Sequence, residues 1–242
     1  MTTDMERLTT NLQIERIDKF LFIGKSPKFP PRVFGGQVLA QSINAAIRTV
    51  DEESVAHSMH AYFMRPGNPK KQIGYEVDPI RDGRSFTTRR VVAKQDGVAI
   101  FSTAISFQIP DPGLEHQFTP PDVPGPEELE DDFDYWTRMA TEDETIDPPL
   151  AHSICRRAVN RRDFLNPADD IGEPRQQYWM KTKEHLGDDP ILHQTFLAYM
   201  SDMTLMGSAL RPHPYSSRSR EFLGASLDHA LWFHRPFRAD EW

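Results

Sequence analysis

The first half of the chain changes from a helical to a strand-like hydrophobic pattern near residue 50. Apolar residues between Leu39 and Val50 recur at spacings of three and four, which predicts a buried helix that opens at Gly35-Gly36. The period then becomes two, and Asp-Gly pairs mark tight hairpin turns. A helix and a one-sided sheet must bury each other, so we expect one helix packed on a meander of antiparallel strands. The expected strands are 20–23, 57–63, 73–77, 85–94 and 99–107.

The second half shows the same kinds of pattern. Strands are expected at Ala158–Phe164, Gln176–Lys183 and Phe222–Phe233. A helix is expected at Leu192–Leu210, and it is apolar on nearly every face, which indicates burial on all sides. We therefore expect a second helix with its own antiparallel sheet.

A proline-rich and acidic segment separates the two halves. We interpret it as a linker with one short helix at Glu127–Met139. The predicted domains are 10–110, a linker at 111–150, and 151–242.

A short motif occurs twice, which indicates two related units. Tyr62-Phe63-Met64-Arg65-Pro66 returns as Trp232-Phe233-His234-Arg235-Pro236, and Arg65 and Arg235 are 170 positions apart. The predicted fold is α+β: a double hot dog, in which each antiparallel sheet wraps a central helix. Strand-like sequence follows the first copy as far as Ile109, whereas only six residues follow the second. We therefore expect the second hot dog to lack about three C-terminal strands by analogy with the first repeat.

Composition narrows the classes of function. The 242 residues suffice for one large or two small domains, and the net charge of −8 argues against general nucleic-acid binding. The N-terminus is too polar for a secretory signal, and the longest uncharged apolar-rich run, Val98–Pro110, is too short to span a membrane. Cys155 is the only cysteine, which excludes an internal disulfide and a cysteine-based zinc site. We expect a cytoplasmic protein without membrane insertion, metal or cofactor.

Asp202 is the most informative single residue, because it lies within an otherwise apolar helix candidate. Burial of a carboxylate is costly unless it is hydrogen-bonded or paired. One interpretation is a functional carboxylate whose pKa is raised by desolvation until it can act as a base. The other is a helix N-cap at Ser201 or Asp202.

Ser226 lies close to a second polar cluster, Asp228-His229. In a strand, Ser226 and Asp228 face one side and His229 faces the other, so adjacency does not make Asp228 and His229 a catalytic pair. A nucleophile elbow of the Gly-x-Ser-x-Gly type is absent from the sequence. Ser226 is interpreted as a hydroxyl that positions a water molecule, or else as an ordinary strand serine.

Five further residues are candidate substrate contacts. Paired glycines suit a helix N-terminus that is approached closely by another backbone or by a ligand. A strand histidine is either structural or functional, and an arginine-rich hairpin is either a solvated sheet edge or a patch for a phosphorylated ligand. The candidates are Gly35, Gly36, His57, Arg84 and Arg89.

The chain resembles the acyl-CoA thioesterase II family, the TesB-like double hot dog enzymes. The resemblance runs in order over about residues 10–242 and rests on several separate motifs. They are Arg32–Val38, His57–Gly67, Arg81–Phe86, Ala104–Gln108 and Leu227–Phe237.

This resemblance implies hydrolysis of fatty acyl-CoA to free acid and coenzyme A, without a covalent intermediate or a metal. The family's water-activating Asp falls on Asp202, and its hydroxyl falls on Ser226, where many relatives have Thr. The third family residue, a Gln, has no counterpart before Trp242, so we expect little or no activity from the chain as given. The resemblance also implies an acyl-CoA substrate and a homo-oligomer, either a dimer or a tetramer.

Two other functions are compatible with the same motifs. One is a catalytically impaired protein that binds acyl-CoA or a partner. The other is a hot dog enoyl-CoA hydratase, which carries an Asp followed five residues later by His. Gly207 stands at that distance from Asp202, which argues against the hydratase.

Overall fold

The computed structural model describes residues 2–27, 32–149, 151–216, 219 and 224–242, and the chain divides into two compact units. Unit 1 comprises Met1–Glu115, Leu186–Asp202 and Ser226–Ala239. Unit 2 comprises His116–His185, Met203–Ala225 and Asp240–Trp242. The two units are therefore not consecutive in the sequence, and two segments of the expected second hot dog fold into unit 1.

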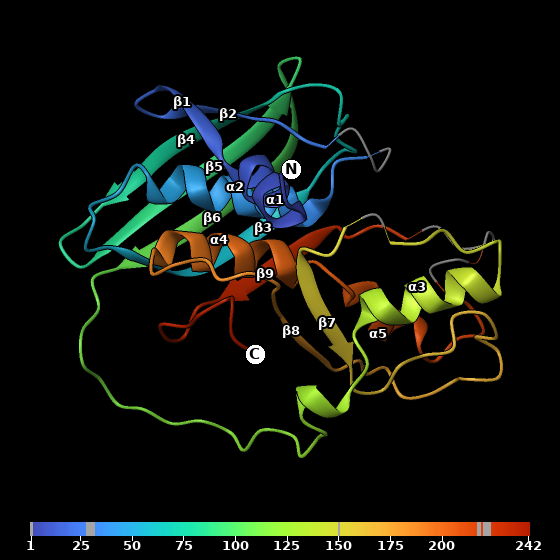
Figure 1. Cartoon of the computed structure of the whole chain (residues 1–242). Coiled ribbons are helices and arrows are strands. Elements are labelled where there is room, and N and C mark those ends of the chain that lie inside the picture. Colours follow the sequence, from blue (N-terminus) through green and yellow to red (C-terminus); the bar gives the residue numbers. More distant parts are fainter. Residues whose placement is uncertain (1, 28–31, 150, 217–218, 220–223) are drawn as a thin grey trace. The chain divides into compact units, whose positions relative to one another are not determined.

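Unit 1 is built on a seven-stranded antiparallel sheet in the order β1-β2-β4-β5-β6-β3-β9 (Figure 1). The short apolar strand expected at 20–23 and the four strands expected from the period-two pattern are confirmed as β2 to β6, although their ends differ by several residues. Strand β1 and helix α1 (Asp4–Leu12) were not predicted. The strands are β1 (Ile14–Asp18), β2 (Leu21–Gly24), β3 (Val55–Phe63), β4 (Ile73–Asp82), β5 (Phe86–Gln95), β6 (Val98–Gln108) and β9 (Asp228–Trp232).

The turn between β5 and β6 has the geometry expected from its sequence. Asp96 and Gly97 both have positive φ, at 50° and 77°, as a tight hairpin turn requires. A residue other than Gly, Asn or Asp seldom adopts this conformation, so the Asp-Gly pair fixes the position of the turn.

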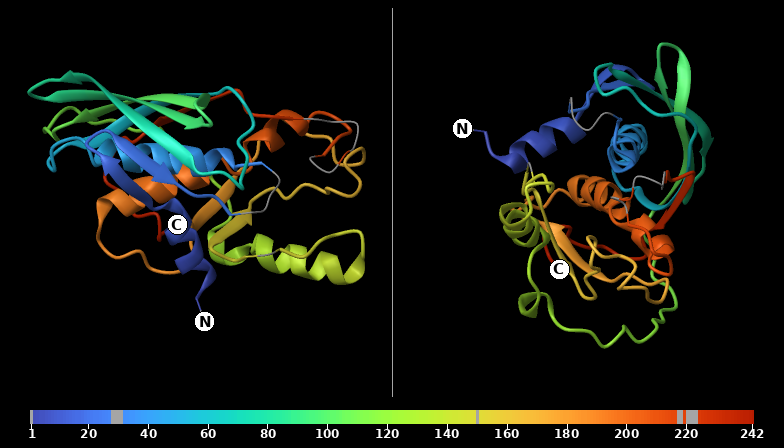
Figure 2. Two further views of the ribbon diagram at one scale, coloured as in Figure 1. Left: turned by 90° about the horizontal axis from the view of Figure 1, so that it is seen from above. Right: turned by 90° about the vertical axis from the view of Figure 1, so that its right-hand side faces the viewer.

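Helix α2 (Gly35–Ile47) lies in the concave face of this sheet, which curves around it (Figure 2). Most of its residues are buried, including polar Gln41 and Ser42. Helix α4 (Pro190–Ser201) packs against α2 and runs alongside it (Figure 1). Pro190 at the first turn and Asp189 as N-cap start α4, since the Asp189 side chain accepts the Ile191 N–H.

The single helix expected at 192–210 is wrong, because the structure breaks it into two. Helix α4 ends at Ser201, Asp202 is its C-cap, and α5 (Leu205–Leu210) follows. Thr204 has a φ of 70°, which cannot belong to a right-handed helix and which a β-branched residue rarely adopts. The N-cap interpretation of Asp202 is also wrong, because Asp202 closes one helix and Thr204 precedes the next.

The strand expected at 222–233 is shorter in the structure, where β9 spans Asp228–Trp232. Residues 222 and 223 of the expectation lie outside the described residues, and Ser226 precedes the strand. Strand β9 pairs antiparallel with β3, so the strands that lead into the two copies of the repeated motif lie side by side, and the copies themselves lie toward opposite ends of the pair. His60 pairs with Ala230, and this pair has the same 170-residue offset as the two motifs.

Unit 2 contains a two-stranded antiparallel sheet of β7 (Ile154–Ala158) and β8 (Tyr178–Thr182). The strand expected at 158–164 is therefore misplaced, because Ala158 is the last residue of β7. The helix expected at 127–139 is α3 (Asp132–Glu142), which follows a 3-10 turn at Pro126–Glu128. Asp131 caps α3 by accepting the Phe133 N–H.

The α+β class with antiparallel sheets is confirmed. Within the described ranges the second sheet has two strands, β7 and β8, and β9 extends the sheet of α2 instead. None of the helices within the described ranges is both long enough and apolar enough to cross a membrane.

Candidate active site

The Asp202 side chain lies against the first turn of α2. A Cβ atom added to Gly35 would lie 2.5 Å from Oδ2 of Asp202, and the Gly36 N–H donates a hydrogen bond to the carboxylate. The Asp202 side chain is only 7% exposed. The first N–H groups of a helix have no partner within the helix and carry partial positive charge, so this position stabilises a carboxylate.

One oxygen of this carboxylate lacks a hydrogen bond. Oδ1 of Asp202 is buried without a hydrogen-bond partner among the described residues. The Nδ1 atom of His229 lies 3.8 Å away, which is too far for a hydrogen bond. Burial raises the pKa of Asp202 to about 6, and the single hydrogen bond from Gly36 opposes this only in part. Asp202 is thus a far stronger base than an exposed aspartate.

The two glycines are required by close packing, as the sequence predicted. A Cβ atom at Gly36 would lie 2.3 Å from the carbonyl oxygen of Tyr199 in α4. Phe34 and Tyr199 contact edge to face beside this crossing, with ring centroids 5.2 Å apart. Another backbone and a carboxylate therefore both approach Gly35-Gly36. Their contact with a substrate remains a prediction.

His229 joins Asp202 from strand β9. It is buried, and its Nε2 atom lies 3.0 Å from Oγ of Ser201, whose hydroxyl donates to the Ala198 carbonyl at 3.0 Å. Nε2 therefore donates to Ser201, and Nδ1 presents a lone pair toward Asp202. Burial lowers the pKa of His229, so the ring is neutral near pH 7. Two acceptors then lie near each other, and a water molecule beside both, about 2.8 Å from each, can donate to both.

The position of His229 beside Asp202 was not predicted from the sequence, although the alternation of strand residues gave its face of the strand. The period-two pattern placed Asp228 and His229 on opposite faces, and the structure confirms this with Asp228 exposed and His229 buried. The inward face of β9 belongs to the sheet that wraps α2. That pairing of β9 with β3 was not predicted, so the neighbours of His229 could not be inferred.

Ser226 lies in the segment that leads into β9 and is half-buried. The following residue, Leu227, accepts the Phe63 N–H at 2.9 Å and so fixes this segment to the end of β3. Within the described ranges, no hydrogen bond joins Ser226 to Asp202. The assignment of Ser226 as a water-positioning hydroxyl stays a prediction.

The other three candidates lie elsewhere in unit 1. His57 contacts Ser106 at 2.8 Å through Nε2, and burial lowers its pKa. Arg84 is exposed. Arg89 is buried, and it pairs with Asp82 at 2.5 Å and donates to the Thr49 carbonyl at 3.0 Å. Arg89 therefore links the end of α2 to the β4–β5 hairpin, and a ligand-binding role for these three residues remains a prediction.

Comparison with known proteins assigns the chain to a family. The model of the acyl-CoA thioesterase N-terminal domain matches residues 25–108, and the acyl-CoA thioesterase model matches residues 156–242. The acyl-coenzyme A thioesterase 8 of Mus musculus is 38% identical over 252 residues, which cover 97% of this chain and 76% of the mouse protein. The chain belongs to the acyl-CoA thioesterase family. The resemblance inferred from the sequence motifs is therefore confirmed.

Two solved structures have a similar architecture. The acyl-CoA thioesterase II TesB2 of Mycobacterium marinum is 40% identical, with a TM-score of 0.76 over 97% of this chain and 82% of that chain. A hot dog protein of Alicyclobacillus acidocaldarius is 18% identical, with a TM-score of 0.73 over 95% of this chain and 79% of that chain. The hot dog fold is therefore confirmed, and the chain is a thioester hydrolase of this family.

Proposed function

We propose that the chain hydrolyses fatty acyl-CoA thioesters by direct attack of water, with Asp202 as the general base. Acyl-CoA hydrolysis is the activity that the family supports. The residue assignment rests on a buried carboxylate that has one oxygen without a hydrogen-bond partner among the described residues and a pKa raised to about 6. An ordinary aspartate is mostly too weak a base at neutral pH to serve this purpose.

The proposed reaction needs no covalent intermediate. A water molecule donates a hydrogen bond to Oδ1 of Asp202, which takes the proton as the oxygen attacks the thioester carbonyl carbon. The carbon–sulfur bond then breaks, coenzyme A leaves as the thiolate, and the proton on Asp202 passes to the sulfur. Base assistance of this kind is worth about 10²–10⁴-fold in rate.

The N-terminus of α2 supplies the proposed oxyanion site. Because the Gly36 N–H is bound to Asp202, we assign the oxyanion to the neighbouring Gly35 N–H. Ser226 is assigned as the second water-holding group on the family resemblance. These assignments place base, nucleophile and oxyanion donor at one end of α2, where a thioester carbonyl can meet all three.

The symmetry of the β3–β9 pair supports the double hot dog in finer detail. His60 and Ala230, which precede the two motif copies at the same 170-residue offset, face each other in an antiparallel pair, as a local two-fold axis between duplicated units requires. We therefore propose that α4 is the central helix of the second hot dog. A cytoplasmic location and a homo-oligomer remain further proposals.

Release of coenzyme A thiol from a series of acyl-CoA substrates tests the function. The wild-type chain is compared with Asp202→Asn and with the matched control Asp228→Asn, whose carboxylate is exposed on β9. We expect Asp202→Asn to lose at least about 100-fold in kcat and the control to lose little. Retention of wild-type turnover by Asp202→Asn contradicts the assignment. Tight binding of acyl-CoA without turnover in the wild type supports the impaired binding protein instead.

A further inference from the structure

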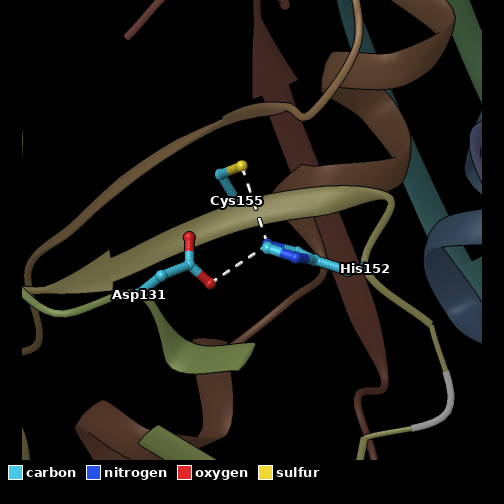
Figure 3. Close-up of side chains that lie close together, drawn as sticks. All are labelled: Asp131, His152 and Cys155. Carbon is cyan, nitrogen blue, oxygen red and sulfur yellow. Dashed lines mark hydrogen bonds and ion pairs between the residues drawn. The ribbon is translucent and has the colours of Figure 1, made fainter. Parts of the chain in front are cut away.

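Three side chains of the kinds that bind metal ions converge in unit 2 (Figure 3). Asp131 is the N-cap of α3, His152 precedes β7, and Cys155 lies within β7. Oδ1 of Asp131 lies 3.3 Å from Nε2 of His152, and Sγ of Cys155 lies 3.8 Å from the same nitrogen. All three donor atoms lie within 4.8 Å of one another.

These separations match those around a tetrahedral zinc ion. Zinc binds histidine nitrogen at about 2.0–2.1 Å, carboxylate oxygen at about 2.0–2.2 Å and thiolate sulfur at about 2.3 Å. Tetrahedral angles then place nitrogen and oxygen about 3.3 Å apart, and nitrogen and sulfur about 3.6 Å apart. The observed 3.3 Å and 3.8 Å fit these values. The oxygen and sulfur atoms lie within 4.8 Å of each other, and an ion bound by all three donors would hold them about 3.6 Å apart.

The neighbouring residue Phe133 holds two of the three donors in place. Its ring stacks on the His152 ring, with centroids 4.3 Å apart and planes inclined by 3°. Its backbone N–H donates to Oδ1 of Asp131 at 2.8 Å. Outer contacts of this kind orient metal ligands before the ion binds and raise the affinity. Asp131 is also 7% exposed, so little water competes for its oxygen atoms.

The same geometry argues against a Cys-His-Asp nucleophile. In such a triad the cysteine and the acid contact opposite nitrogens of the histidine ring. Here both contact Nε2, while Nδ1 lies 3.0 Å from Nζ of Lys183. Three ligands of a single ion must place their donor atoms around one point, and the oxygen of Asp131, Nε2 of His152 and the sulfur of Cys155 are grouped in this way.

We propose that Asp131, His152 and Cys155 bind a zinc ion or another thiophilic divalent cation, with water as the fourth ligand. One carboxylate and one thiolate neutralise the charge of the ion, and binding releases the thiol proton. The single cysteine excludes a site built of several cysteines, whereas this site mixes three ligand types. The inference is independent of the thioesterase reaction.

Substitution of Lys183 provides a test in which metal affinity is expected to increase, whereas substitution of a ligand is expected to decrease it. When Nε2 binds the ion, Nδ1 must carry the ring proton, and the nearby ammonium group can no longer donate to it. Lys183 is exposed, so its side chain can turn into solvent. Its positive charge still repels the cation. Lys183→Met is therefore expected to bind metal more tightly than the wild type.

Cobalt titration of the full, untagged chain tests the proposal after treatment with a chelator. We expect a sulfur-to-cobalt charge-transfer band that saturates at one equivalent and disappears when zinc is added. The band should be lost in Cys155→Ser and His152→Gln, persist in the control His116→Gln, and saturate at lower cobalt in Lys183→Met. Circular dichroism of each metal-free variant establishes that it is folded.

Two outcomes overturn the proposal. One is a wild-type chain that shows no charge-transfer band at stoichiometric cobalt. The other is a band that survives in Cys155→Ser, which would place the sulfur ligand elsewhere or show an adventitious complex. The first outcome is measured on the wild type alone, so it can refute the proposal even if a variant fails to fold.

Discussion

Two aspartates of this chain are almost equally buried but are surrounded differently. The Asp202 side chain is 7% exposed and the Asp131 side chain is 6% exposed. Asp131 accepts the Phe133 N–H and pairs with His152, whereas Oδ1 of Asp202 has no hydrogen-bond partner among the described residues. The two carboxylates therefore differ in their hydrogen bonds and not in their burial. At Asp202, an oxygen that is buried without a hydrogen-bond donor favours the protonated form and can accept a hydrogen bond from water.

The helices at which the two residues lie account for this difference. Asp131 caps its own helix, so its carboxylate bonds to the helix that follows it. Asp202 ends α4 and meets the N-terminus of another helix, α2, from which the Gly36 N–H is the one donor to its carboxylate among the described residues. A carboxylate that caps its own helix receives hydrogen bonds from residues next to it in the sequence. A carboxylate held by tertiary packing depends on the hydrogen-bond donors of a distant segment.

The largest expected effect is on the pH dependence of stability. Because the pKa of Asp202 is about 6 in the folded chain against an ordinary 3.8, the folded state binds this proton more tightly than the unfolded state. Its contribution to stability is therefore fully present below pH 3.8 and is lost as the pH rises to about 6. The loss is about 3 kcal/mol. Asp202→Asn should remove it, as measured by urea unfolding across this range.

Asp131→Asn is the matched control for that experiment, because it changes the same functional group at similar burial. It should leave the pH dependence assigned to Asp202 intact. If wild type and Asp202→Asn instead lose stability in parallel between pH 4 and pH 6, then Asp202 is not the group that titrates with a raised pKa.

The next effect concerns the contact between α2 and α4. Gly36→Ala places a Cβ atom 2.3 Å from the Tyr199 carbonyl, so the helices must separate. Overpacking of this kind costs about 1–3 kcal/mol, and the shift should also weaken the Gly36–Asp202 bond and lower kcat. Chemical denaturation measures the loss. Gly74→Ala is the control, since its Cβ would meet nothing closer than 3.9 Å, and equal destabilisation of both variants would contradict this role for Gly36.

The smallest effect concerns His229. His229→Gln replaces a ring lone pair near Oδ1 of Asp202 with an amide that can donate to it. A new donor favours the carboxylate, so the apparent pKa seen in the rate should fall below about 6. His60→Gln, on the exposed side of β3, should leave it unchanged. An unchanged or higher apparent pKa in His229→Gln would show that His229 does not affect the pKa of the base, Asp202.

Much of the local structure could be predicted from the sequence, because hydrophobic period and turn residues act over short distances. Helix α2, strands β2 to β6 and the Asp96-Gly97 turn follow from such signals. The break at Thr204 could not be predicted, since a β-branched residue disfavours the positive φ that it adopts there. The pairing of β9 with β3 joins segments 170 residues apart, and no local pattern specifies a distant partner.

The candidate site shows the same limit. Asp202 was identifiable because a charged residue interrupts an apolar segment, and Gly35-Gly36 because paired glycines permit close approach. That the two meet depends on the packing of α4 against α2. The neighbours of His229 depend on the pairing of β9. The sequence therefore identified the residue types, and only the fold shows which of them are in contact.

The pH dependence of kcat/KM for an acyl-CoA substrate tests the central claim most directly, because it reports the pKa of the essential base in the free enzyme. We expect the rate to rise with pH and to level off above an apparent pKa of about 6, and we expect this pH dependence to be absent from the residual activity of Asp202→Asn. A flat profile through that range, or the same pH dependence in Asp202→Asn, would show that another group activates the water.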